Sequence, residues 1–532
     1  MTTQIDRLWR GARAYAMSQD RPVASVLAAH GGTLVYVGDD ISRASSLLSP
    51  NYETIDLQGL TVIPGLIDSH AHTLHEGLRL GQLDLKGLNF DETLKAVAKA
   101  VSNLPPGAWL HGRAWDHNLF PNQKWPDKQA LDAVSPLNPV ILDRIDKHSL
   151  WVNSRALELA DPSVYGPDPE GGEIVRSADG SPSGVLIGRA MFLVLAKAPA
   201  LDGQDLGTTL LLAANEFLSF GLTTVVDAAT GEAELNAIER LIAKGELKIR
   251  YRAYVHPQRW TRWGDLTRVD GLYDDRLAID GLKLFSDGSL GSQSAWLLDD
   301  YADRPGHRGA KSLDDQTLEK SLIYARDHGL QVAIHVIGDA AVAQAVSVMA
   351  KVLGPGWTDR RWRLEHFQVV APEDRDRALA MGLIPSIQSV GLMTDIAMAE
   401  SRLGSKRLKR AYAWRDILDR GGYIINGSDC PVESPNPFEG IYAAVTRRDL
   451  QGWPIEGFLP EQRLTRWEAL ASYTVWGAKA AFKSGRLGQL IPGALADFVV
   501  IDRDIMDCSV REIAKIKALK TIVAGETVYE AS

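Results

Sequence analysis

The chain has 532 residues, of which 45% are hydrophobic and 23% charged, and its formal net charge of −9 is spread along the sequence. This composition is typical of a folded protein with more than one domain. No cluster of Lys and Arg with interleaved aromatic residues is present, which argues against a nucleic-acid surface. Two cysteines are too few for a disulfide framework. The expected partner is therefore a small molecule.

No segment has the pattern of a membrane or secretion signal. The first fifteen residues lack the apolar stretch of a secretory signal. The most hydrophobic run begins at Gly184 and contains Arg189 and Lys197, so we expect a buried helix there rather than a membrane span. The sequence thus predicts a cytoplasmic protein that does not bind a membrane.

The two ends of the chain share a pattern of short β-type runs. Residues 25–39 near the start, and residues 490–502 and 520–531 near the end, are apolar runs broken by glycine-containing turns. We expect residues 1–63 and 486–532 to build one small β-sandwich domain from both termini.

Residues 64–485 have a different pattern, in which apolar, β-branched runs alternate with helix-like segments. Eight such runs begin near Leu60, Gly221, Lys248, Ile279, Leu330, Arg361, Leu383 and Tyr423. This alternation predicts parallel βα units, and eight of them predict an α/β fold with a closed, TIM-like (β/α)8 barrel. Roughly 130 residues separate the first two runs, too many for one crossover, so we expect a large insertion at about 85–212.

Helix-like segments flank the fifth run on both sides. The first begins at Ser312, has Asp315 in the position of a capping box, and ends at Gly329. The second covers residues 339–354 and has apolar side chains at helical spacing. Both are expected to be crossover helices of the barrel.

Side chains that bind metals fall at the ends of several predicted strands. His70 and His72 lie two residues apart, so both project from one side of the first strand. His335, His366 and Asp429 end the fifth, sixth and eighth strands. In a barrel of this kind these ends meet at the C-terminal rim, where active sites are built. Imidazoles with a carboxylate predict a site for zinc, manganese, cobalt, nickel or iron.

Two polar residues lie near His70 and His72 in the sequence, and their roles are predicted less sharply. Asp68 lies on the same side of the strand as His70 but further from the rim, and we expect it to orient a ligand or to pack the barrel. His75 is expected in the loop beyond the strand, where a histidine that faces solvent is the simplest interpretation.

The chain resembles the amidohydrolase superfamily in the order of its candidate site residues. These are Asp68, His70, His72, His335, His366 and Asp429. The phrases LKLFSDGSLGSQSAW, HVIGDAA, RLEHFQ and NGSDCPV narrow the resemblance to the amidohydrolase 3 branch, which includes N-substituted formamide deformylases. The resemblance covers nearly the whole chain and is specific for the fold and the metal site, but not for the substrate. It implies a metal-dependent hydrolase that cleaves an amide-type C–N bond in an N-acyl amine, an N-formyl amine or a cyclic amide.

The resemblance also gives a role to Lys283, at the end of the fourth strand. An ordinary ammonium group would repel a metal cation. In similar amidohydrolases a lysine at this position is carboxylated by carbon dioxide, and the carbamate bridges two metals. The resemblance therefore implies two divalent ions, zinc being expected first. One ion takes His70, His72 and Asp429, the other takes His335 and His366, and Lys283 lies between them.

The charges of the metal and of Asp429 predict how water would be activated. Metal coordination lowers the pKa of water from about 15.7 towards 7, so a metal-activated hydroxide is the expected nucleophile. Asp429 is the candidate general base, which would return the proton to the leaving nitrogen; its alternative role is that of a structural ligand. Other functions left open are a mononuclear deaminase, an ester or lactone hydrolase, and an inactive metal-binding scaffold.

Substrate contacts are expected from the insertion and from the loops at the strand ends. The aromatic residues of the insertion favour a substrate with an apolar part, although they could equally attach the insertion to the barrel. Because members of the superfamily often dimerise, a homodimer is a further prediction. The candidate substrate-binding residues are Trp115, Asp116, His148, Asn153, Ser289 and Ser292.

Overall fold

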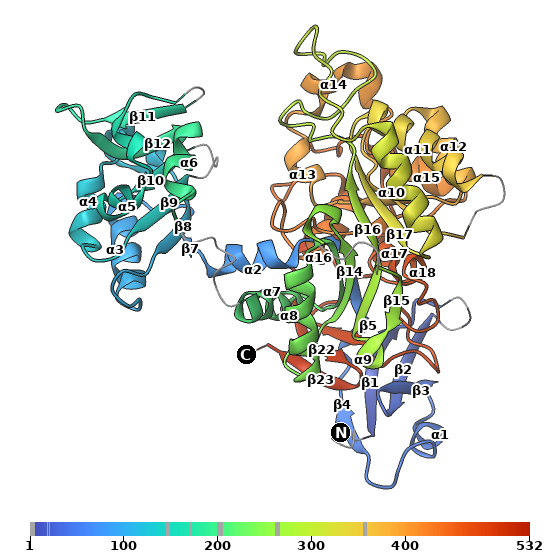
Figure 1. Ribbon diagram of the computed structural model, residues 1–532. Helices are drawn as coiled ribbons and strands as arrows, with labels where there is room; N and C mark the ends of the chain where they lie inside the picture. The colour runs from blue at the N-terminus through green and yellow to red at the C-terminus, as the bar shows by residue number, and fades with distance from the viewer. Residues whose placement is uncertain are drawn as a thin grey trace. The chain divides into compact units, whose positions relative to one another are not determined.

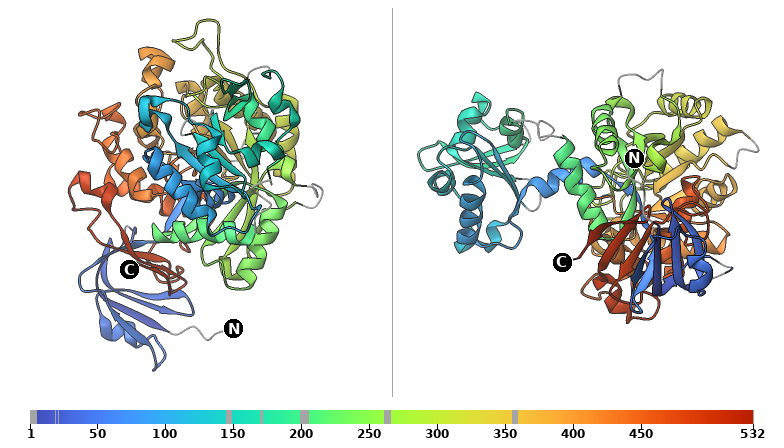
Figure 2. Two further views of the ribbon diagram at one scale, coloured as in Figure 1. Left: turned by 90° about the vertical axis from the view of Figure 1, so that its left-hand side faces the viewer. Right: turned by 90° about the horizontal axis from the view of Figure 1, so that it is seen from below.

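A computed structural model of the protein describes residues 6–18, 20, 22–144, 149–169, 172–198, 206–260, 266–354 and 359–531. The chain divides into two compact units, one of Met1–Glu76 with Ala213–Ser532 and one of Gly77–Leu212. Figures 1 and 2 show their elements. None of the described helices is both long and apolar enough to cross a membrane.

Eight parallel strands form the centre of the first unit (Figure 1). They are β6 (Leu66–Ala71), β13 (Leu222–Thr230), β14 (Arg250–Val255), β16 (Leu277–Phe285), β17 (Gln331–Val336), β18 (Arg363–His366), β19 (Ile384–Ile387) and β20 (Ile425–Asn426), hydrogen-bonded in this order. Beyond β20 and β6, the Asp429 amide donates to the His70 carbonyl (2.7 Å) and the His72 amide donates to the Cys430 carbonyl (3.0 Å). These bonds join the last strand to the first. The predicted TIM-like barrel is confirmed, and each predicted run supplies one barrel strand. The first run also contains Thr61–Pro64, a strand of another sheet.

Helices connect these strands. Their apolar faces pack on the barrel, as Leu318, Leu322 and Ala325 do from α10. The helices are α7 (Leu206–Ser219), α8 (Glu232–Ala243), α9 (Leu272–Asp275), α10 (Asp315–Asp327), α11 (Asp339–Leu353), α12 (Pro372–Ala380), α13 (Leu392–Asp395), α14 (Ala399–Leu408), α15 (Trp414–Asp419), α16 (Pro437–Thr446), α17 (Arg466–Ser472) and α18 (Val475–Ala480).

The two helices that flank β17 are present, but the predicted start of the first is wrong. Helix α10 begins at Asp315 rather than near Ser312. Its N-cap is Asp314, whose carboxylate accepts a hydrogen bond from the Thr317 amide (2.9 Å). A capping carboxylate satisfies an amide that has no partner within the helix, and here it decides where the helix starts.

Both ends of the chain form an additional domain (Figure 2, blue and red strands). Hydrogen bonds join its strands into one sheet. The sandwich arrangement stays a prediction. In its core, Trp9 packs edge-on against Phe498 from the other end of the chain, with ring centroids 4.9 Å apart. The strands are β1 (Arg7–Tyr15), β2 (Val23–His30), β3 (Thr33–Gly38), β4 (Glu53–Asp56), β5 (Thr61–Pro64), β21 (Phe498–Ile501), β22 (Ala518–Val523) and β23 (Glu526–Glu530), with helix α1 (Ile41–Ser45) between β3 and β4.

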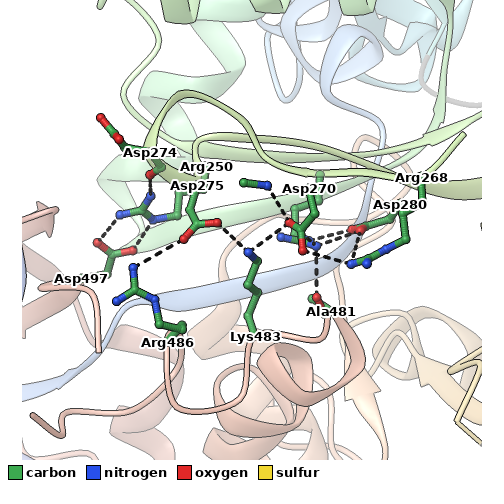
Figure 3. A network of polar contacts seen from close by, with 12 residues as sticks. Arg250, Arg268, Asp270, Asp274, Asp275, Asp280, Ala481, Lys483, Arg486 and Asp497 are labelled. Atoms are coloured by element: carbon green, nitrogen blue, oxygen red, sulfur yellow. Dashed lines mark hydrogen bonds and ion pairs between the residues drawn. The ribbon is translucent and has the colours of Figure 1, made fainter. Parts of the chain in front are cut away.

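Ion pairs close the end of the barrel at which the strands begin (Figure 3). Arg250 donates to both carboxylate oxygens of Asp497 (2.6 and 2.9 Å) and so connects β14 to the terminal sheet. Arg252 makes the same double contact with Asp280 (2.7 and 2.8 Å). Further ion pairs of this network join Lys483 to Asp270 and Asp275, and Arg268 to Asp270 and Asp280.

The second unit enters the sequence between β6 and β13 and begins within α2 (Thr73–Gly81). Its sheet has the order β11-β12-β10-β9-β8-β7. The segment from Gly184 was expected as one buried helix, and this is wrong: it completes β12, which pairs with β10 and β11, and then forms a short turn and α6. The elements are β7 (Leu83–Asp84), α3 (Phe90–Val101), β8 (Leu110–Trp115), α4 (Lys128–Val134), β9 (Val140–Arg144), β10 (Ser149–Val152), α5 (Ser154–Leu159), β11 (Gly172–Arg176), β12 (Pro182–Gly188) and α6 (Phe192–Leu195).

Candidate metal centre

Three of the predicted ligands meet where the barrel strands end. One ring nitrogen from each of His70 and His72 and one carboxylate oxygen of Asp429 all lie within 4.8 Å of one another. His72 Nε2 lies 3.1 Å from Asp429 Oδ1, and His70 Nε2 lies 3.4 Å from the same oxygen. Two imidazole nitrogens and a carboxylate oxygen around one point are a ligand set typical of zinc and similar divalent metals. These residues therefore fit a metal ion.

His335 and His366 lie beside this cluster. The His366 ring centroid is 5.2 Å from that of His70 and 4.4 Å from that of His335. His335 Nε2 lies 3.2 Å from the carbonyl oxygen of Gly288. Within the described ranges, the metal-ligand grouping consists of His70, His72 and Asp429, and the two further histidines form an adjacent pair.

Two of these positions have an unusual backbone. His366 has φ = +71° and Asp429 has φ = +59°, in the left-handed region that residues other than glycine rarely adopt. Such strain costs of order 1–3 kcal/mol per residue and concentrates at functional sites. The strain agrees with positions that are occupied for their side-chain chemistry rather than for stability.

Glu365 is a functional residue that the sequence analysis missed. Its carboxylate accepts hydrogen bonds from Arg363 (2.7 and 3.0 Å) and a further one from His70 Nδ1. Since the carboxylate can only accept, His70 Nδ1 must carry the proton, which leaves the lone pair on Nε2 for a metal. The available signal was the pair of charged residues two apart in a buried strand, because both must face the same side of β18.

Asp68 connects the two chain segments that carry the ligands. Its carboxylate accepts hydrogen bonds from the His70 amide (2.9 Å), the Ser428 amide (3.1 Å) and the Ser428 hydroxyl (2.6 Å). Burial raises the pKa of Asp68 to about 6. These contacts agree with the prediction of an orienting role. His75 is exposed, but it lies in the first turn of α2 rather than in a loop, so that part of its prediction is wrong.

The protonation states suit metal binding. Burial lowers the pKa of His70 to about 4 and that of His366 to about 3, so both imidazoles are neutral near pH 7, as metal ligands must be. Burial alone would raise the pKa of Asp429, but His70, His72 and His366 outweigh it and hold this pKa below its usual range. Asp429 is therefore ionised.

Lys283 is fully buried on β16, next to the ligands. Its Nζ lies 3.1 Å from His70 Nε2. Burial lowers the pKa of Lys283 to about 8, because a charged ammonium is poorly solvated there. A larger fraction of this amine is therefore uncharged near neutral pH than for a lysine on the surface.

A cavity of about 380 Å³ lies beside the ligands, and His335, His366 and Asp429 form part of its wall. Its size is typical of a small-molecule site. Its lining includes apolar side chains, those of Leu290, Ile337, Ile387, Met398, Trp414 and Val432. It also includes polar side chains, those of Gln368, Gln388, Asp395, Tyr412 and Glu433.

The two predicted substrate-binding serines lie near this cavity. Ser289 lines it. Ser292 is not a lining residue, but its hydroxyl oxygen lies 2.7 Å from that of Ser289. Direct contact with a substrate stays a prediction for both residues.

For two predicted contacts in the second unit the structure gives a correction. Trp115 is fully buried and its Nε1 donates to the Leu142 carbonyl (2.8 Å). Asn153 is also fully buried, and its side-chain oxygen caps α5 by accepting from the Ala156 amide (3.0 Å). Both side chains are part of the unit's own core, so direct contact with a substrate is contradicted for them.

For the other two residues predicted in this unit, Asp116 and His148, burial does not decide whether they contact a substrate. Asp116 is half-buried and pairs with Arg144 at 3.2 Å. Its role in substrate binding stays a prediction. The prediction for His148 lies outside the described residues.

Histidines and an aspartate that converge where the strands of a parallel barrel end, beside a small-molecule cavity, define a metal-dependent hydrolase. The amidohydrolase family matches residues 53–529 of this chain. The chain is 31% identical over 531 residues to the Bacillus subtilis (strain 168) protein YtcJ, which is named as an amidohydrolase, with 99% of each chain covered. It is 27% identical to the N-substituted formamide deformylase of Arthrobacter pascens, covering 100% of this chain and 99% of the relative.

A solved structure is also similar. An uncharacterised metal-dependent hydrolase from Pyrococcus horikoshii OT3 superposes with a TM-score of 0.78 at 26% identity, covering 95% of this chain and 99% of the other. The chain therefore belongs to the amidohydrolase family. It is a metal-dependent hydrolase.

Proposed function

We propose that this protein hydrolyses a non-peptide amide bond in a small molecule, such as an N-acyl amine, an N-formyl amine or a cyclic amide. The observation that carries the proposal is the meeting of His70, His72 and Asp429 at the wall of a small-molecule cavity. The relative from Arthrobacter pascens, which is named for N-substituted formamides, supports this substrate class.

The proposed centre would hold two zinc ions, or manganese, cobalt, nickel or iron, with carboxylated Lys283 among its ligands. Carbon dioxide reacts with an uncharged amine, and the lowered pKa of Lys283 increases that form. Its Nζ lies 3.1 Å from His70 Nε2, at the edge of the three-ligand cluster. The neighbouring rings of His335 and His366, 4.4 Å apart, are the proposed ligands of the second ion.

A bound divalent metal lowers the pKa of water and polarises a substrate carbonyl. Asp429 is the proposed general base, because it is ionised and reaches both the ligand cluster and the cavity. It accepts a proton from the attacking water and returns that proton to the leaving nitrogen, which completes hydrolysis. Glu365 holds His70 in the tautomer that binds metal, and Asp68 fixes the distance between the segments that carry His70 and Asp429.

A mononuclear enzyme is the second candidate. The three donor atoms within 4.8 Å of one another suffice for one ion. Such a centre would suit a deaminase, or an ester or lactone hydrolase, built on the same barrel.

Location and assembly are separate proposals. We propose a cytoplasmic enzyme, which the two unpaired cysteines, Cys430 and Cys508, support. The homodimer expected from the resemblance stays a prediction, which native mass measurement tests.

Metal analysis combined with a substrate library tests the proposal. Protein purified without chelators is assayed for bound metal by mass spectrometry and for turnover of N-acyl amines, N-formyl amines, lactams, amino-heterocycles, esters and lactones. We expect about two metals per chain and turnover that depends on them. Lys283→Ala should lower the metal content, whereas Lys351→Ala, at an exposed lysine of α11, should not.

The same experiment separates the candidates. One metal per chain that is unchanged in Lys283→Ala would contradict the bridged centre and favour the mononuclear enzyme. Metal-dependent turnover confined to heterocyclic amines or to esters would contradict amide hydrolysis. Absence of any metal-dependent turnover would favour the inactive scaffold.

A further inference from the structure

The lining of the cavity includes two carboxylates that have no cationic partner among the described residues. Asp395 ends α13, and its Oδ2 accepts hydrogen bonds from Gln368 Nε2 (2.8 Å) and the Tyr412 hydroxyl (2.9 Å). Glu433 follows β20 and accepts a hydrogen bond from the Thr394 hydroxyl. Neither carboxylate forms an ion pair with a Lys, Arg or His anywhere in the described part of the chain.

Buried carboxylates elsewhere in this unit are compensated in two ways. Glu365 has Arg363 beside it, whereas Asp68, which does not line the cavity, has hydrogen-bond donors as its partners. At Asp395 and Glu433 no such charge is present, and burial raises the pKa of the first to about 6 and that of the second to about 7. A cavity that retains uncompensated carboxylates is typical of a binding site, because a ligand can supply the missing charge.

The hydrogen bonds around these carboxylates leave free acceptors. Tyr412 and Gln368 are buried, and both donate to the same oxygen of Asp395, which fixes the carboxylate. Its other oxygen, Oδ1, accepts no hydrogen bond from any described residue, and neither does Glu433 Oε2. Gln388 Nε2, a donor that is buried in the wall of the cavity, has no partner among the described residues either and can serve an acceptor group of the ligand.

We infer that the substrate carries an organic cation, of the ammonium or guanidinium type, which binds between Asp395 and Glu433 while its amide bond lies at the metal ligands. The position of the amide bond rests on the proposed function. The lining also includes the apolar side chains of Leu290, Ile337 and Met398, which suit an alkyl or aryl spacer between the cation and the amide. Mono-N-acylated diamines are the simplest members of this class.

Matched substrates test the charge preference. N-Formyl and N-acetyl derivatives of 1,5-diaminopentane have a terminal ammonium, those of pentylamine a methyl group, those of 5-aminopentanol a hydroxyl, and those of 6-aminohexanoate a carboxylate. We expect kcat/KM to be about 100-fold higher for the ammonium compound than for the neutral ones, since a site built for a polar group discriminates strongly against its absence. Equal or higher kcat/KM for the neutral or anionic compounds would overturn the inference.

Variants connect the preference to the two carboxylates. Asp395→Asn and Glu433→Gln should each reduce the ratio of kcat/KM between ammonium and methyl substrates by about 10-fold, because each removes one of the charges that bind the cation. Glu400→Gln is the matched control, because Glu400 is exposed on the neighbouring helix α14 and does not line the cavity. A ratio that is unchanged in both cavity variants would also overturn the inference.

A binding measurement separates this inference from the proposed function. Pentylammonium and pentanol are titrated into the metal-loaded protein by calorimetry. We expect the ammonium to bind at least about 10-fold more tightly, and this difference to disappear in Asp395→Asn. If the ammonium binds more tightly in this way but no amide is hydrolysed, the cation site is supported and the proposed function is contradicted. Equal binding of the two probes would contradict the cation site even where turnover is found.

Discussion

The two ends of the barrel both contain buried charged side chains, but these are compensated differently. Where the strands begin, Arg250 and Arg252 each donate two hydrogen bonds to one carboxylate, and this end carries a dense network of ion pairs (Figure 3). Where the strands end, Asp429 faces imidazoles and Glu365 pairs with Arg363, but Asp395 and Glu433 form no ion pair with any described residue. The first end matches its buried charges within the protein, whereas the second leaves these two carboxylates without a matching cation.

This difference separates stability from function along one barrel. A charge that is matched within the protein contributes to a defined fold, whereas one left unmatched has to be compensated by something that binds. At the functional end the missing charge corresponds to the metal and to the cation inferred for the substrate. Four predictions test this division, beginning with the largest effect.

Asp429→Asn should lower kcat/KM by about 1,000-fold or more, because it removes the proposed proton acceptor. The free energy of unfolding of the metal-free protein should change far less. Steady-state kinetics and chemical denaturation measure the two quantities. Asp419→Asn, at an exposed carboxylate on α15, is the control and should leave kcat/KM unchanged. Activity within a few-fold of the wild type would exclude Asp429 as the base.

Asp280→Asn, at the opposite end, should have the reverse profile. It leaves Arg252 buried without its full counter-charge, so the free energy of unfolding should fall by about 3 kcal/mol. Turnover per folded molecule should not change, since neither residue lines the cavity. A variant of normal stability but low turnover would show that the two ends are not separate in this way.

Glu365→Gln should weaken metal binding by about 10–100-fold, because it removes the carboxylate that orients His70. Competition with a chromophoric chelator measures this affinity. Glu373→Gln, at an exposed position on α12, is the control. Unchanged affinity in Glu365→Gln would mean that the tautomer of His70 is set by another contact.

Lys483→Met should have the smallest effect, and one that depends on pH. Burial raises the pKa of Asp270 and Asp275, but Lys483 and nearby arginines outweigh it and hold both values below the usual range. Their pairing therefore stabilises the fold above the unfolded pKa of about 3.9, and this stability is lost as the pH falls through the lower folded values. We expect a loss of about 1 kcal/mol at pH 7 that shrinks towards pH 2.

Denaturation at several pH values measures this difference. Lys320→Met, at an exposed lysine on α10, should show no such trend. A loss in Lys483→Met that is the same at pH 2 and pH 7 would mean that the lysine acts through its packing rather than through its charge.

Much of this architecture could be predicted because each barrel strand is one apolar run and parallel strands bring their ends together. The same rule placed His70, His72 and Asp429 at a common site. Glu365 was missed because it lies beside His366, whose ligand signal is stronger, and because the partner that reveals its role is almost 300 residues away in β6.

The cavity could not be predicted by these means. Asp395 and Glu433 belong to no periodic pattern, and only the fold brings them to the lining of one cavity. The tryptophans of the insertion were visible in the sequence, but their role was not, because an aromatic side chain suits a core and a substrate pocket equally well. Burial of Trp115 decides for the core in its case.

The most direct test of this division is an anomalous difference map from crystals grown with zinc and measured at its absorption edge. The account predicts a peak about 2.0–2.2 Å from His70 Nε2, His72 Nε2 and a carboxylate oxygen of Asp429, with a second peak near His335 and His366. A map without a peak at these side chains, or with zinc bound only elsewhere, would contradict the account.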